Sequence, residues 1–169
     1  EYYQNNYCRI KHIYIATQFS SNFNENGEPI YDENGNYTKD YTEEEKAAKL
    51  ARVSQLEAVL TKDNFADYVE EYNEDPAVNI YKNGFYLSAN TDYDANVITA
   101  GLTMNTGEVR KVETAYGIYF VYKYELDKGA WSNEENSDFF GDMYDTVCDK
   151  LYNEMINGYF KDIEINEEA

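Results

Sequence analysis

The chain has 169 residues, of which 43% are hydrophobic, and it carries a net charge of −19. This length and composition fit one folded domain with an appendage, and they exclude a globally disordered chain. Positive charge is not clustered, which excludes nucleic-acid binding, and the acidic balance disfavours contact with an anionic membrane. No apolar run is long enough for direct insertion into a membrane.

The metal-binding residue types are scarce. There is one histidine, His12, and the two cysteines, Cys8 and Cys148, lie far apart in the sequence. A zinc site needs several such ligands at short spacing, so we expect no metal and no cofactor. The two cysteines could form a disulfide if the chain is extracytoplasmic, and their spacing leaves this open.

Residues 7–16 predict the first strand, because β-branched and aromatic residues dominate the segment. The period of two places Cys8, Ile10, His12 and Tyr14 on one face of this strand. Residues 20–41 are polar and contain two Asn-Gly steps, which favour tight turns. We therefore expect a polar hairpin or loop there.

The polar segment also contains oxygen-bearing side chains at the spacing of a calcium-binding loop. These are Asp32, Asn34, Asn36, Thr38, Asp40 and Glu43. However, Tyr37 occupies the position where such loops need glycine, and no helix is predicted before the loop. The polar hairpin is therefore the favoured interpretation.

Two helices should follow. Thr42 and Glu45 fit a capping box, which predicts a helix from about Glu43 to Leu60. Its apolar stripe consists of Leu50, Val53, Leu56 and Leu60. Asp63 is the expected cap of a second helix that ends before Asp75-Pro76, since the residue before proline disfavours helical geometry. The apolar face of this second helix consists of Phe65, Tyr68, Val69 and Tyr72.

The remaining elements alternate between strands and helices. A strand is predicted over residues 84–88, a third helix capped by Asp92, and two strands over residues 109–113 and 117–125. The third helix should bury Val97, Ala100, Gly101 and Met104. After a polar connector, residues 137–160 predict a long amphipathic helix with a stripe of Phe140, Met143, Val147, Leu151 and Met155. This order indicates a mixed α+β domain.

Three segments carry a family resemblance: RIKHIYI from Arg9, FADYVEEYNEDPAVNIYKNGFYL from Phe65, and MNTGEVRKVETAYGIYFVYK from Met104. In this order they resemble the parvulin family of peptidyl-prolyl isomerases. The resemblance implies an α+β fold with a four-stranded antiparallel sheet surrounded by helices. The tail resembles the C-terminal helix of extracytoplasmic foldases of the PrsA and SurA types.

The resemblance also implies a division of the chain. Residues 1–7 would be a linker from a missing N-terminal part, and residues 8–126 would form the parvulin-like domain, with residues 20–41 as an insert. Residues 127–169 would form a connector and the C-terminal helix, through which the chain could self-associate. The chain would then be a trimmed or mature fragment, located outside the cytoplasm.

The family's site residues match four positions that we expect to be catalytic. His12 matches the first histidine, Asp75 the Asp or Cys position, and Thr114 the hydroxyl before the final strand. Tyr119 stands where the second histidine usually lies. Tyr93 and Val97 fall near the Met and Phe of the proline pocket and are expected to bind substrate. The same residues also have structural interpretations: a strand histidine, a turn aspartate, a β-forming threonine and a buried strand tyrosine.

The resemblance implies catalysis of cis–trans isomerisation in proline-containing segments of unfolded or extended client polypeptides. Tyr119 and Val97 depart from the family pattern, so weak or absent activity is expected. An alternative is a catalytically inactive chaperone or protein-interaction module with the same fold. A third, more distant interpretation is an unrelated acidic surface-binding protein.

Overall fold

The computed structural model describes residues 2–21, 28–133 and 137–161. The chain divides into two compact units, a larger one of residues 6–125 and a smaller one of residues 1–5 together with 126–169.

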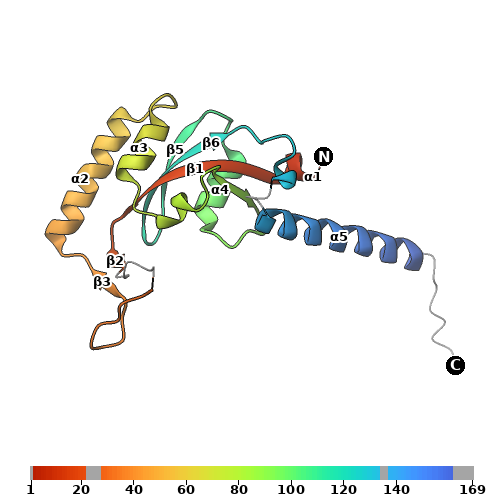
Figure 1. The fold of residues 1–169 in the computed structure, drawn as a ribbon, viewed down its shortest axis with the longest axis horizontal. Coiled ribbons are helices and arrows are strands. Elements are labelled where there is room, and N and C mark those ends of the chain that lie inside the picture. The colour runs from red at the N-terminus through yellow and green to blue at the C-terminus, as the bar shows by residue number, and fades with distance from the viewer. Residues whose placement is uncertain (1, 22–27, 134–136, 162–169) are drawn as a thin grey trace. The chain divides into compact units, whose positions relative to one another are not determined.

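A four-stranded antiparallel sheet forms the centre of the larger unit (Figure 1). Its strands are β1 (Tyr7–Ala16), β4 (Phe85–Ser88), β5 (Val109–Glu113) and β6 (Gly117–Tyr124), in the order β4-β1-β6-β5. β1 is the long central strand, because alternating buried residues allow it to pair with β4 on one side and β6 on the other. The predicted α+β class with a four-stranded antiparallel sheet is confirmed.

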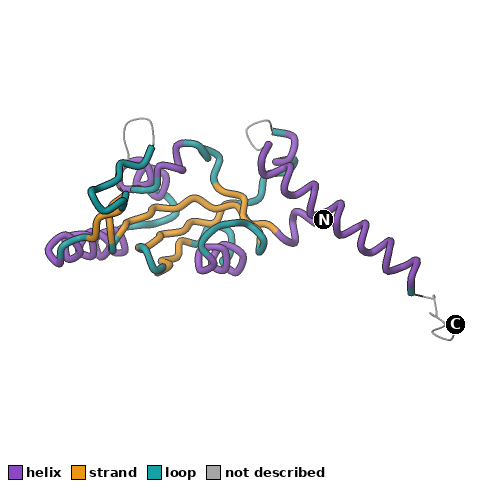
Figure 2. Tube along the Cα trace, turned by 90° about the horizontal axis from the view of Figure 1, so that it is seen from below, coloured by secondary structure: helices purple, strands orange, loops and turns teal. Residues whose placement is uncertain are grey.

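Helices cover both faces of this sheet (Figure 2). The predicted alternation in β1 is the reason: Ile13 and Ile15 pack on one face, and Cys8 and Ile10 pack on the other. Helices α2 (Glu43–Val59) and α3 (Phe65–Tyr72) cover the first face. Helix α4 (Ala95–Thr103) covers the second, which also carries His12. The two faces therefore have separate hydrophobic cores.

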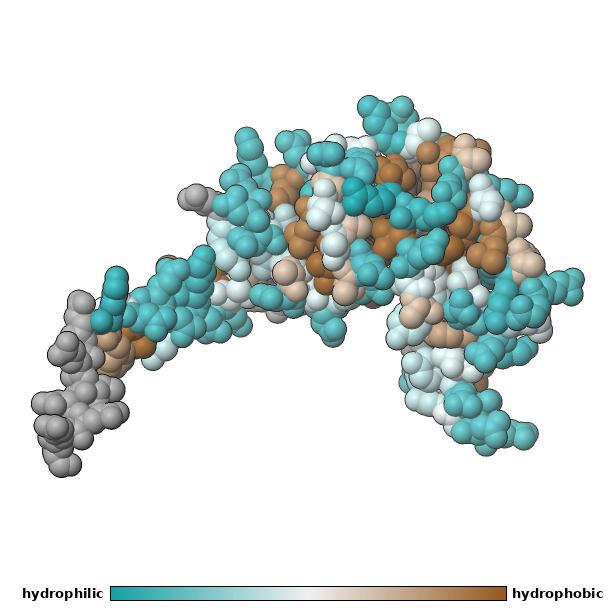
Figure 3. Space-filling model, turned by 180° about the vertical axis from the view of Figure 1, so that it is seen from behind, coloured by the Kyte–Doolittle hydropathy of each residue, from teal (hydrophilic) through white to brown (hydrophobic). Residues whose placement is uncertain are grey.

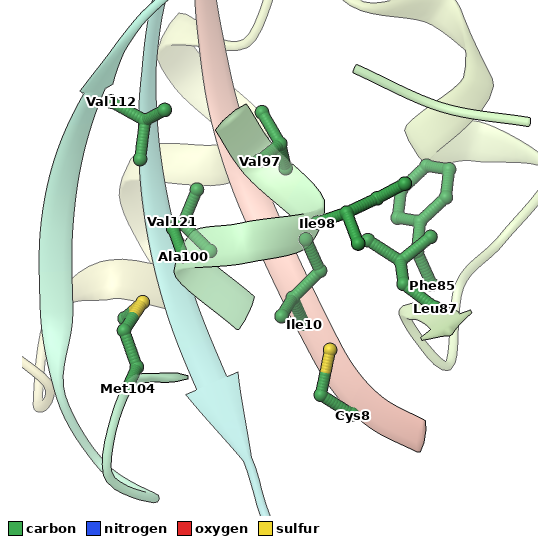
Figure 4. Packing of buried hydrophobic residues seen from close by; sticks show 10 residues of the cluster. All are labelled: Cys8, Ile10, Phe85, Leu87, Val97, Ile98, Ala100, Met104, Val112 and Val121. Carbon is green, nitrogen blue, oxygen red and sulfur yellow. The ribbon is translucent and has the colours of Figure 1, made fainter. Parts of the chain in front are cut away.

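The predicted apolar face of α4 is confirmed and lies against the sheet (Figure 4). Val97, Ala100 and Met104 are buried in the same cluster as Cys8. Gly101 permits this close approach, since a Cβ built there would lie 2.7 Å from the Cys8 Sγ. α4 is thus fixed on the sheet face that carries the candidate site.

The helix caps differ in part from the predictions. The capping box is confirmed, since the Thr42 side chain accepts from Glu45 N and Glu45 accepts from Thr42 N. The prediction that Asp63 and Asp92 cap the second and third helices is wrong. Each lies one residue or more before the true N-cap, and a capping side chain must reach the backbone N–H groups of the first turn. Asn64 is the N-cap of α3, and Asp94, which accepts from two backbone N–H groups, is the N-cap of α4.

The polar insert begins and ends in a two-stranded sheet of β2 (Phe19–Ser21) and β3 (Thr38–Asp40). Residues 22–27 of the predicted insert lie outside the described residues. The Asp32 Oδ1 accepts from the backbone N–H groups of Asn34 and Asn36, both at 2.8 Å. These bonds hold a tight turn, which supports the hairpin interpretation of the segment.

The smaller unit consists of α1 (Tyr2–Asn6), the 3-10 turn η2 (Ala130–Ser132) and α5 (Ser137–Phe160). α5 has the bounds predicted from sequence. Within residues 1–7, which were expected to be a linker, Tyr2–Asn6 form the short helix α1. Of the predicted stripe, Leu151 and Met155 are exposed, and the Phe140 side chain lies outside the described residues. Among the described helices, none is both long and apolar enough to cross a membrane.

Candidate active site

Residues 73–75 fix one side of the candidate site by covering the free edge of β1. β4 pairs with β1 only from Tyr7 to Ile10, which leaves the second half of that edge open. Glu74 N donates to Tyr14 O at 2.9 Å, Tyr14 N donates to the Asn73 Oδ1 at 2.6 Å, and Ala16 N donates to the Glu74 Oε2 at 3.0 Å. This attachment places Asp75 beside His12.

The centre of the site is a pair formed by a buried histidine and a partly exposed aspartate. The His12 Nε2 lies 2.8 Å from the Asp75 Oδ2, and the side chain of His12 is 0% exposed whereas that of Asp75 is 18% exposed. The Asp75 Oδ1 also accepts from Ala77 N, at the start of the 3-10 turn η1 (Pro76–Asn79). Burial by itself would raise the pKa of Asp75, but the hydrogen bonds from His12 and Ala77 hold it below its usual value. The carboxylate is therefore ionised at neutral pH.

This ionised carboxylate defines the hydrogen-bonding role of His12. A carboxylate can only accept, so the proton of the pair lies on Nε2. In the neutral imidazole, Nδ1 is then an acceptor, and the Tyr93 hydroxyl lies 3.4 Å from it. With a neutral imidazole, Tyr93 donates to the His12 Nδ1 and the His12 Nε2 donates to Asp75.

Tyr119 contacts the imidazole differently from Tyr93. Its ring meets that of His12 edge-on, with the centroids 5.2 Å apart. Burial, together with the negative charges of Asp75 and Asp94, raises the pKa of both Tyr93 and Tyr119. Both phenols are therefore neutral hydrogen-bond donors at physiological pH. Tyr119 therefore meets His12 through its ring edge, whereas the Tyr93 hydroxyl lies within hydrogen-bond distance of the His12 Nδ1.

Further aromatic rings, which sequence reasoning did not assign to the site, complete its floor. The Phe85 ring lies 4.9 Å from that of His12, and the Tyr14 ring lies 4.6 Å from that of Tyr119. Tyr81, 44% exposed, borders the floor with its ring 4.9 Å from Phe85. The alternation of β1 already placed Tyr14 on the face of His12, so that signal was present. Phe85 and Tyr81 approach only through the pairing of β4 with β1.

Hydrophobic side chains also reach the surface of the larger unit. Seen from behind, this unit carries a patch of hydrophobic side chains bordered by hydrophilic ones (Figure 3). Ile80, next to Tyr81 in the turn that follows η1, is 76% exposed. The aromatic floor therefore has an exposed apolar neighbour on the side of η1.

Thr114 and Val97 have structural roles, in a turn and in the core. The Thr114 Oγ1 donates to Gly117 O at 2.9 Å and accepts from Gly117 N and Tyr116 N, so it closes the β5–β6 turn. Val97 is 0% exposed and belongs to the core against which Tyr93 and Tyr119 pack. The structure thus brings together His12, Asp75, Tyr93 and Tyr119, with Val97 beneath them and Thr114 in a turn.

The cysteines take no part in this site. Both are free cysteines, and Cys8 is buried whereas Cys148 is exposed. Burial raises the pKa of the Cys8 thiol to about 11. Since the thiolate is the reactive form, Cys8 is a packing residue under α4.

Comparisons with known proteins show similarity to solved structures. No protein-family model matches the chain, and no curated protein matches it. The structure of PrsA from Bacillus subtilis is 17% identical to this chain, with a TM-score of 0.42. The match covers 99% of this chain, which spans only 55% of the length of PrsA. TbPIN1 is 17% identical with a TM-score of 0.42, covering 71% of this chain and 98% of its own.

A third solved structure, the PPIase domain of TbPar42, is 20% identical with a TM-score of 0.43, covering 70% of this chain and 99% of its own. At these identities the similarity concerns the fold alone.

Proposed function

We propose that the larger unit binds proline-containing segments of other polypeptides and acts on them as a weak peptidyl-prolyl cis–trans isomerase. The observation that carries this proposal is the pair of buried His12 and partly exposed Asp75 beside the two neutral phenols of Tyr93 and Tyr119. This arrangement offers hydrogen-bond donors, an anionic acceptor and an aromatic floor within one surface.

The reaction sets simple demands on a site. Rotation about the X-Pro bond crosses a barrier of about 18–20 kcal/mol, and no covalent bond is broken. Catalysis then depends on binding the twisted amide more tightly than the planar one, which favours fixed dipoles on a dry surface. The aromatic rings supply the apolar surface for a proline ring, and the phenols can donate to the carbonyl of the twisted amide.

The residues divide into two roles. His12 is wholly buried and has both ring nitrogens within reach of partners, so it positions Asp75 and Tyr93. Asp75, Tyr93 and Tyr119 are partly exposed and can touch a bound peptide. Because a phenol replaces an imidazole and Val97 is a small residue beneath the floor, the site holds the twisted amide less firmly, which is the reason for expecting weak activity.

The clients and the location of the protein are also part of this proposal. We expect clients that are unfolded or extended exported proteins, and a location outside the cytoplasm, either secreted or anchored at the cell surface. The support is the resemblance of residues 127–169 to the tails of extracytoplasmic foldases. The exposed side chains of Leu151 and Met155 on α5 suit self-association or client binding.

The test is NMR exchange spectroscopy on a proline-containing peptide with catalytic amounts of the whole chain. Exchange between cis and trans signals should depend on protein, and Tyr93→Phe and Tyr119→Phe should each slow it by about tenfold, equivalent to about 1.4 kcal/mol. Tyr116→Phe is the matched control, since Tyr116 is 56% exposed and its ring contacts Phe19 rather than His12.

A non-catalytic chaperone is the second candidate, favoured by the complete burial of His12 and the phenol at position 119. Peptide binding without exchange would support it and reject the isomerase proposal. If the peptide neither exchanges nor binds, both candidates fail. Tyr119→His, which restores the family's residue type, should increase exchange if the isomerase proposal is correct.

A further inference from the structure

Glu74 links helix α2 to the segment that carries Asp75. Its Oε1 lies 2.5 Å from the Lys49 Nζ and 3.5 Å from the Arg52 Nη1, and both cations belong to α2. Its Oε2 accepts from Ala16 N at 3.0 Å, at the end of β1. One carboxylate therefore holds two cations of a helix and a backbone N–H of the central strand.

This link passes over the edge of the sheet, from one face to the other. α2 covers the face opposite to the one that carries His12. Residues 73–75 run along the edge between these faces, where Glu74 N donates to Tyr14 O at 2.9 Å. Asp75 directly follows Glu74, and its Oδ2 lies 2.8 Å from the His12 Nε2. The ion pairs of α2 are therefore connected to the site on the other face.

Partial burial gives the Glu74 carboxylate a defined orientation. The side chains of Glu74 and Lys49 are 23% and 21% exposed. Another pair joins α2 to the sheet, Glu57 with Lys111, and its side chains are 50% and 32% exposed. Solvent screens a partly buried pair less than an exposed one, and the hydrogen bond from Ala16 N fixes the second oxygen of Glu74. The carboxylate is thus held more firmly than that of an exposed surface pair.

We propose that Glu74 is a positioning residue, which acts through Asp75 by holding it against His12. Lys49 and Arg52 orient the Glu74 carboxylate for this role. The inference rests on the proposed isomerase function of the site, and it adds a dependence of that site on two charges of α2. Other hydrogen bonds also attach this segment to β1, so the loss of the Glu74 carboxylate should loosen the segment and not release it.

His12 reports on this positioning without ambiguity, because it is the only histidine of the 169 residues. When Asp75 is held in place, the ring proton of the neutral imidazole lies on Nε2. A loosened Asp75 would let the proton move between the two ring nitrogens, which changes the ¹⁵N shifts of both. If Glu74 served only overall stability, its loss would lower the free energy of unfolding and leave these shifts of the folded chain unchanged.

The experiment records the His12 ring ¹⁵N shifts of the whole chain, and the cis–trans exchange of a proline-containing peptide, for a set of variants. Glu74→Gln keeps an oxygen that can accept from Ala16 N but removes the charge that binds the two cations of α2. It should shift the His12 signals and slow exchange by about threefold, within the range for the loss of one ion pair. Lys49→Gln should do the same, and Lys49→Arg, which keeps the cation, should change much less.

Glu57→Gln is the matched control, because Glu57 also joins α2 to the sheet, through Lys111 at 2.8 Å, but its partner lies in β5. It should leave both readouts unchanged. The proposal is overturned if Glu74→Gln leaves the His12 signals where Glu57→Gln leaves them, or if Lys49→Arg behaves like Lys49→Gln. Should Glu74→Gln not fold, the two Lys49 variants decide the question. If the chain catalyses no exchange, the isomerase proposal fails, and the His12 signals still decide the role of Glu74.

Discussion

Replacing Asp75 with alanine should destabilise the larger unit by about 2–4 kcal/mol. The His12 Nε2–H is fully buried and donates to Asp75 at 2.8 Å, so the variant leaves a buried donor without its acceptor. Such a loss costs about 1–3 kcal/mol. The variant also removes the bond that Asp75 accepts from Ala77 N at the start of η1, and loss of a cap costs about 1 kcal/mol.

Asp94→Ala is the matched control for this variant. Asp94 also caps a helix, accepting from the N–H groups of Asn96 and Val97, but it holds no buried imidazole. Its loss should cost about 1 kcal/mol. Urea unfolding of the whole chain, followed by the fluorescence of its tyrosines, measures both variants. If the two substitutions cost the same, the His12–Asp75 bond contributes no stability and the reasoning is refuted.

The pH dependence of the same variant gives an independent check. The pKa of Asp75 in the folded state lies below its unfolded value, which is about 3.9. The folded state therefore binds fewer protons in that window, so stability from Asp75 is fully present above the unfolded pKa and is lost as the pH falls through the folded pKa. Asp75→Ala should flatten the loss of stability of the wild-type chain in this acidic window.

Three further outcomes are expected. Gly101→Ala should destabilise the larger unit by about 1–3 kcal/mol in urea unfolding, because its Cβ would lie 2.7 Å from the Cys8 Sγ. Adding Cys8→Ala should recover part of that loss. If the double variant recovers no stability, the packing explanation is contradicted. Burial raises the pKa of Tyr14 to about 12, so the free energy of unfolding should decline as the pH rises from about 10 through 12. Tyr14→Phe should reduce this decline. An unchanged alkaline profile in the variant would refute the role of Tyr14. Peptides with lysine before proline should bind about fivefold more tightly than those with glutamate, because the negative charges of Asp75 and Asp94 lie close enough to the site to raise the pKa of Tyr93 and Tyr119. An equal affinity of the two peptides at low salt would exclude this preference.

Most of the fold could be predicted because its signals are local. The alternation in β1 identified both of its faces, and the Thr42 capping box located the start of α2. The caps Asp63 and Asp92 were placed wrongly because several neighbouring Asp and Asn residues can cap equally well in sequence. Which of them caps is decided by where the helix packs, and that depends on tertiary contacts.

The site was harder to predict because it depends on contacts between distant segments. His12 and Asp75 were expected as a pair only through a family pattern, and Asn73 and Glu74 join them through hydrogen bonds to the edge of β1. These two residues hydrogen-bond there because β4 is too short to cover β1 fully. Nothing in the sequence of β4 shows how far it pairs, so the role of residues 73–75 could be found only from the three-dimensional structure.

The tyrosines of the aromatic floor provide the second partner of the buried histidine. A buried imidazole needs partners for both nitrogens, and Asp75 supplies only one. Tyr93, from the loop before α4, supplies the other, so Tyr119 in β6 is left to pack edge-on against the ring. The side chain at position 119 is therefore not needed as a hydrogen-bond partner of the His12 Nδ1. Because the partner of the His12 Nδ1 is Tyr93 and not a residue of β6, Tyr93→Phe should disturb His12 more than Tyr119→Phe does.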